Sequence, residues 1–69
     1  KEKDVRKYLD NGVVEILLLS ESLPSEKIEA VMEVAKQFGT KIFLFSETTQ
    51  EGLQLKELGG FGAILRYKQ

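Results

Sequence analysis

Apolar and polar residues alternate along the chain in two rhythms, which predict helices and strands in turn. From Lys1 to Asp10, the apolar residues Val5, Tyr8 and Leu9 recur three and four positions apart among charged residues, the spacing of one helical face. The run from Val13 to Leu19, VVEILLL, is nearly continuously apolar and too short for a typical helix. Such a run is typical of a strand buried on both faces of a sheet. We therefore expect a helix followed by a buried strand.

The same order recurs in the middle of the chain. Pro24 suits the first turn of a helix, where its missing N–H is not needed. An apolar stripe then extends from Ile28 to Phe38, and the helix is expected to end at Gly39. The short run from Lys41 to Phe45, KIFLF, predicts a second strand.

The last third of the chain predicts another helix and strand. In SETTQEGLQLKELGG, Thr48 and Glu51 are three residues apart and fit a capping box at the start of a helix. FGAILRY predicts the third strand. Gly59 and Gly60 are expected to reverse the chain between the two elements, and Gly62 to let the strand pass close to a helix.

Helices and strands that alternate with short connections are typical of α/β domains. We therefore expect residues 1–69 to form one α/β domain with the order α-β-α-β-α-β. The expected architecture is a three-layer α/β/α sandwich around a small, mainly parallel sheet. The first strand is the most uniformly apolar, so we expect it at the centre.

Composition removes many functional classes. The 69 residues include no Cys and no His, which excludes disulfides, thiolate nucleophiles, zinc fingers and imidazole bases. The net charge of −1 is spread evenly, whereas a nucleic-acid-binding domain usually presents a basic face. No apolar run approaches the ~20 residues of a membrane span, so we expect a cytoplasmic protein without membrane contact. The charged start at Lys1 suggests a fragment of a longer chain.

No residue set predicts catalysis, a metal site or a cofactor. The serines of SESLPS have no general base nearby and are interpreted as turn and cap residues. Glu15, Glu21 and Glu47 flank predicted strands but lack a third ligand. The glycines of GGFG follow a helix and open a strand, the reverse of a dinucleotide-binding loop.

The residues after the third strand leave two interpretations open. Arg66 and Tyr67 either end the strand with amphipathic side chains or form a recognition pair, since both residue types are enriched at binding hot spots. Leu53 and Phe61 look exposed beside the third helix, which favours a protein-binding patch.

Two stretches together resemble the C-terminal domain of archaeal and eukaryotic class 1 peptide chain release factors. They are LDNGVVEILLLSESL and SETTQEGLQLKELGGFGAILRYKQ, and the similarity covers nearly the whole chain in order. The related Pelota family of ribosome-rescue factors is the alternative. LRY at the end of the strand is nearer the release factors. Conversely, Leu23 is followed directly by Pro24, whereas release factors insert a small subdomain there. Pelota also lacks this insertion. Val13 and Phe61 replace the alanine and isoleucine usual in release factors.

The resemblance implies a non-catalytic interaction domain for translation termination. In that family the domain docks an elongation-factor-like translational GTPase and later contacts the ribosome-recycling ABC ATPase on the ribosome. GGQ and NIKS, the release-factor motifs for peptide release and codon reading, do not occur here. By position in the matching segment, the expected contact residues are Gln50, Gln54, Phe61, Arg66 and Tyr67. An RNA-binding module, as in ribosomal proteins with a similar sandwich, is a further alternative that the near-neutral charge disfavours.

Overall fold

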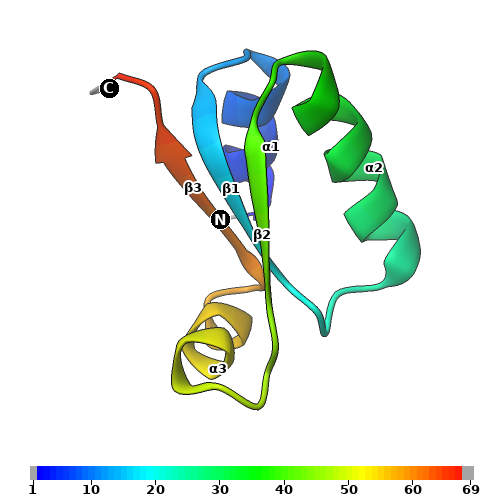
Figure 1. The fold of residues 1–69 in the computed structure, drawn as a ribbon, viewed down its shortest axis with the longest axis vertical. Coiled ribbons are helices and arrows are strands. Elements are labelled where there is room, and N and C mark those ends of the chain that lie inside the picture. The colour runs from blue at the N-terminus through cyan, green and yellow to red at the C-terminus, as the bar shows by residue number, and fades with distance from the viewer. Residues whose placement is uncertain (1, 68–69) are drawn as a thin grey trace.

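The computed structural model describes residues 2–67 and contains the six predicted elements in the predicted order. The second strand matches its predicted range fully, and the other elements lie within one or two residues of theirs, except that α3 is shorter than the predicted stretch 46–60. Lys1, where the first helix was expected to start, lies outside the described residues. The elements in Figure 1 are α1 (Glu2–Asp10), β1 (Val14–Ser20), α2 (Ser25–Gln37), β2 (Lys41–Phe45), α3 (Gln50–Glu57) and β3 (Phe61–Leu65).

The sheet has the order β2-β1-β3 and is mixed, so the prediction of a mainly parallel sheet is wrong. β1 pairs with β2 in parallel and with β3 antiparallel, with Leu19 opposite Phe61. The reason is the placement of α3. This helix has only eight residues, about 12 Å, and lies across the end of the strands instead of running back along a face (Figure 1). β3 therefore starts where β1 ends and returns beside it. The central position predicted for β1 is confirmed.

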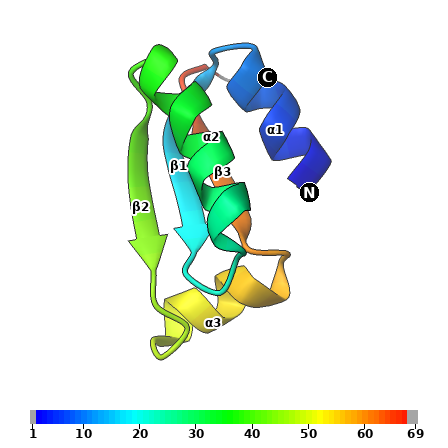
Figure 2. The ribbon, with the colours of Figure 1, turned by 90° about the vertical axis from the view of Figure 1, so that its right-hand side faces the viewer.

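The helices do not form the expected three layers. α1 and α2 contact each other and lie on the same face of the sheet (Figure 2). α3 contacts all three strands from the end of the sheet. Among the described residues, the second face is therefore covered only at that end.

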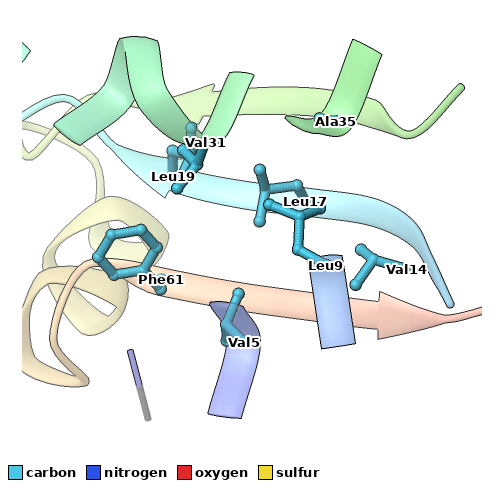
Figure 3. Packing of buried hydrophobic residues seen from close by; sticks show 8 residues of the cluster. All are labelled: Val5, Leu9, Val14, Leu17, Leu19, Val31, Ala35 and Phe61. Atoms are coloured by element: carbon cyan, nitrogen blue, oxygen red, sulfur yellow. The ribbon is translucent and has the colours of Figure 1, made fainter. Parts of the chain in front are cut away.

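The core lies between β1 and the paired helices. Leu17 and Leu19 of β1 are fully buried and point to the same side, as alternate residues of a strand must. A register irregularity between Val14 and Ile16 brings Val14 into the core as well. Figure 3 shows these side chains packed against those of α1, α2 and β3; the cluster comprises Val5, Leu9, Val14, Leu17, Leu19, Val31, Ala35 and Phe61.

The chain reversal between α3 and β3 depends on two glycines. Gly59 and Gly60 have φ values of 102° and 87°, which an L side chain adopts only with strain. The Gly60 N–H donates to the Leu55 carbonyl at 2.8 Å and closes the last turn of α3. The predicted role of these glycines is therefore confirmed.

Thr49, and not Thr48, caps α3. The Thr49 hydroxyl accepts from the Gly52 N–H at 3.0 Å, whereas the Thr48 hydroxyl pairs with that of Ser46 at 2.7 Å in the preceding turn. The predicted capping box of Thr48 and Glu51 is therefore wrong by one residue, because the turn at Ser46 delays the start of the helix.

Thr49→Ala is expected to lower the free energy of unfolding by about 1 kcal/mol, since it leaves one N–H of the first helical turn without its partner. Thr48→Ala is the matched control, because it removes the same atoms one residue earlier. Urea unfolding followed by circular dichroism measures both. Equal losses for the two variants would contradict the assignment of Thr49 as the cap.

Candidate functional site

The five expected contact residues do not form one site. Gln50 and Gln54 are exposed on α3, at the end of the sheet where β1 finishes. Arg66 and Tyr67 follow β3 at the opposite end of the sheet, and Tyr67 is 65% exposed. The structure therefore separates the α3 pair from the strand-end pair by the length of β3.

Phe61 belongs to the core. Its side chain is 5% exposed and is part of the main hydrophobic cluster (Figure 3). The prediction that Phe61 looks outward is wrong, because its place opposite Leu19 directs it to the helix-covered face. Leu53 is 48% exposed, so the same prediction is confirmed for that residue.

Arg66 links the C-terminal ends of two helices. Its guanidinium donates to the Gly12 carbonyl at 3.2 Å through Nε and to the Phe38 carbonyl at 2.7 Å. Phe38 is the C-cap residue of α2, and Gly12 lies two residues beyond the last residue of α1. Carbonyls near a helix C-terminus carry the partial negative charge that favours a cation. No sequence signal placed these three segments together, because they are joined only by the tertiary fold.

Arg66→Met is expected to lower the free energy of unfolding by about 1–2 kcal/mol, since it keeps the aliphatic stem and removes both donors. The value lies at the low end for charged donors because the guanidinium is exposed. Arg6→Met is the control: Arg6 makes one exposed pair with Asp10 at 3.6 Å, worth less than about 0.5 kcal/mol. Thermal unfolding of both variants measures the difference, and equal melting temperatures would contradict the linking role of Arg66.

The uncovered face of the sheet meets α3 in an apolar hollow, which we call the α3 groove. The hollow has a volume of about 290 Å³. Its floor comes from β1 and β2 and its wall from α3, and the lining residues are Leu18, Phe45, Glu51, Gln54, Leu55 and Leu58. Gly62 of β3 lets strand and helix approach closely at this junction, since a Cβ atom there would lie 3.3 Å from Leu18 and 3.4 Å from Leu55. This close approach of strand and helix confirms the predicted role of Gly62.

The groove combines an apolar floor with a polar rim. Glu51 and Gln54 are exposed on its wall, and the nearby Lys56 pairs with Glu47 at 2.9 Å. Within residues 2–67, no three acidic side chains gather as a metal site would require. An apolar hollow with a few polar groups at its edge is suited to binding a side chain of a partner.

Similarity to known proteins covers the whole chain. A family model described as eRF1 domain 3 matches residues 1–69. Among the most similar curated relatives is the Pelota homologue of Pyrococcus horikoshii, which is 39% identical over 96% of this chain and 20% of the relative. The chain thus spans about a fifth of the length of that relative. No helix in the described part of the chain is long and apolar enough to cross a membrane.

Solved structures of both Pelota-type factors and release factors share the fold of this chain. Dom34 of S. cerevisiae, described as a translation termination-like factor that interacts with Hbs1, matches with a TM-score of 0.89 and 26% identity over 100% of this chain and 21% of Dom34. The archaeal translation termination factor aRF1 matches with a TM-score of 0.82 and 38% identity over 97% of this chain and 19% of aRF1. An archaeal Pelota in a model with the ribosome and ABCE1 matches with a TM-score of 0.87 and 30% identity over 99% of this chain and 20% of that Pelota.

Proposed function

This chain belongs to the eRF1 domain 3 family, and from that premise we propose that it is the non-catalytic, partner-binding domain of a Pelota-like ribosome-rescue factor. The family takes part in translation termination or ribosome rescue. The LRY ending of the third strand favoured termination. The similarity of the chain to archaeal Pelota homologues supports rescue instead. The direct connection from β1 to α2 at residues 21–24, without an inserted subdomain, agrees with this choice.

The proposed partner is an elongation-factor-like translational GTPase. Dom34, which shares the fold over the full chain, is described as interacting with Hbs1. The related archaeal Pelota is described together with the ribosome and ABCE1, which supports the ABC ATPase as a second partner on the ribosome. For both partners, the domain supplies a binding surface while other proteins or domains supply the chemistry.

The observation on which the proposal rests is the α3 groove. It is apolar and open, and four of its six lining residues lie in the segment 46–69, whose residues resemble the family most specifically. An anchor side chain of the GTPase would lie on Leu18 and Leu58, while Gln54 would bond to the partner's backbone. Gln50 lies at the start of the same helix and extends the contact surface. Arg66 and Tyr67 would lie outside this contact.

The test measures binding of the purified GTPase to this chain by titration calorimetry at two salt concentrations. We expect saturable binding that changes little with salt, since the groove is mainly apolar. Leu58→Ala combined with Gln54→Ala should weaken binding at least ~10-fold, a loss of about 1.4 kcal/mol. Leu53→Ala is the matched control, because Leu53 is equally exposed on α3 but does not line the groove. Equal affinities for both variants would contradict docking at the groove.

Termination is the second candidate, favoured by the 38% identity to aRF1. An assay of a full-length protein that carries this domain distinguishes termination from rescue. A release factor hydrolyses peptidyl-tRNA at a stop codon on a purified ribosome, whereas a rescue factor promotes subunit splitting without hydrolysis. Hydrolysis that depends on a stop codon would overturn the rescue assignment and leave the partner-binding role of this domain in place.

A further inference from the structure

β2 forms an edge of the sheet that is exposed on both faces. None of its five residues is buried, and Phe43 and Leu44, which point to opposite faces, are 51% and 49% exposed. In Figure 2, β2 lies at the margin of the molecule with no described element beyond it. Helices contact both edge strands, α2 and α3 on β2 and α1 and α3 on β3, but β3 has the buried Phe61 whereas no residue of β2 is buried. β2 is thus the less protected of the two edges.

The backbone groups of β2 divide into inward and outward sets. The Phe45 carbonyl accepts from the Glu21 N–H at 2.9 Å, so the backbone of Phe45 faces β1. Backbone groups alternate in direction along a strand. Lys41 and Phe43 therefore also face β1, while the N–H and C=O of Ile42 and Leu44 face outward. Among the described strands, β2 pairs with β1 alone.

The outward groups are symmetric about Phe43. An antiparallel copy of the same strand would place Ile42 opposite Leu44, and Leu44 opposite Ile42, and each pair would exchange both of its hydrogen bonds. The two-fold axis would pass beside Phe43. We propose that two copies of this chain associate through β2 in this register and join their sheets into one.

The side chains fit the same register. The two Phe43 side chains would be direct cross-strand neighbours on the uncovered face, an arrangement favourable for aromatic rings. Ile42 and Leu44 would pair on the other face. Lys41, the strand's one charged residue, would lie opposite Phe45, so no like charges meet.

β2 lacks most of the features that keep sheet edges apart. It contains no proline, its pairing with β1 is regular, and its one lysine lies at its first position. The interface is nevertheless short. A five-residue edge buries far less than a standard interface, so we expect a dissociation constant of ~0.1–1 mM. This association does not depend on the proposed docking of a GTPase.

Sedimentation equilibrium of the chain from about 20 µM to about 2 mM spans this range. We expect a monomer at the low end and a dimer at the high end. Amide hydrogen exchange of Ile42 and Leu44 should slow as the concentration rises, while that of Phe43, which already bonds to β1, should not. A monomer at every concentration would overturn the proposal.

Two lysine variants distinguish association through the β2 edge from association through the uncovered face of the sheet. Phe43→Lys would place two charges directly opposite each other at the axis and should abolish the dimer. Ile64→Lys makes the same charge change at a residue that is 49% exposed on the same face of the sheet but on β3, and it should leave the dimer intact. Loss of the dimer in both variants would indicate face-to-face packing and overturn pairing through β2.

Leu44→Pro provides a second, independent variant. It removes one outward N–H, and an edge strand tolerates proline at such a position. We expect a folded monomer by circular dichroism and sedimentation. A Leu44→Pro chain that still dimerises with the wild-type affinity would contradict the proposed hydrogen bonds.

Discussion

Phe61→Ala is expected to lower the free energy of unfolding by about 3–5 kcal/mol. The ring is 5% exposed and packs in the core between β3 and the helices (Figure 3). Truncation therefore loses buried apolar area and leaves a cavity that the rigid strand next to it cannot close. A chain of 69 residues has few kcal/mol to lose, so the variant should be largely unfolded at 37 °C. Urea and thermal unfolding measure the loss.

Phe43→Ala is the matched control, because it makes the same chemical change on the opposite, uncovered face of the sheet. Phe43 is half exposed on β2, and its truncation in the monomer should cost less than about 1 kcal/mol. The comparison is made at low concentration, where self-association does not contribute. If both variants lost equal stability, Phe61 would not be the core residue that the structure indicates.

Gly52→Ala is expected to destabilise the chain by about 1–3 kcal/mol or more. In an ordinary helix the change from Gly to Ala stabilises by up to about 1 kcal/mol, so the expected sign is reversed here. A Cβ atom on Gly52 would overlap the Ser46 carbonyl oxygen and would lie 2.9 Å from the Thr49 hydroxyl. The carbonyl cannot move away freely, because it accepts from both the N–H and the hydroxyl of Thr49.

Gly39→Ala is the control for the glycine change. Gly39 has a φ of 69°, and a Cβ there would meet nothing within 4 Å. Its substitution should cost only the left-handed backbone strain, about 1–2 kcal/mol. Chemical unfolding followed by circular dichroism gives the free energy of unfolding of both variants. The loss in Gly52→Ala reports the steric clash, and the loss in Gly39→Ala reports the backbone strain. A Gly52→Ala chain as stable as the wild type would show that Ser46 moves away without cost.

Packing thus explains part of the segment that resembles the family. A glycine is required at position 52 because the Ser46 carbonyl leaves no room for a side chain, and a large apolar residue is required at Phe61 because it fills the core. Arg66 is held by two helix-end carbonyls. Of the contact residues expected from the sequence, Gln50 and Gln54 lie on or beside the α3 groove without such an internal role. A binding assay is therefore most informative at Gln54 and its neighbour Leu58.

The sequence alone determined the order of the elements and their approximate bounds. Strands and helices differ in the period of their apolar residues, which is a local property that a short window records. For this reason Lys41–Phe45 was predicted in full, and β1 was placed at the centre from its continuous apolar run. The reversal at Gly59 and Gly60 was also local, since it depends on the backbone freedom of two adjacent residues.

The tertiary structure alone decided the direction of β3, the burial of Phe61 and the partners of Arg66. An apolar strand has the same pattern in either direction, so only the crosswise placement of the short helix α3 makes β3 antiparallel to β1. That direction sets Phe61 opposite Leu19 and carries Arg66 to the ends of α1 and α2. The α3 groove follows from the same placement, because α3 covers one end of the sheet and no described helix covers the rest of that face. The free edge of β2 follows from the strand order β2-β1-β3.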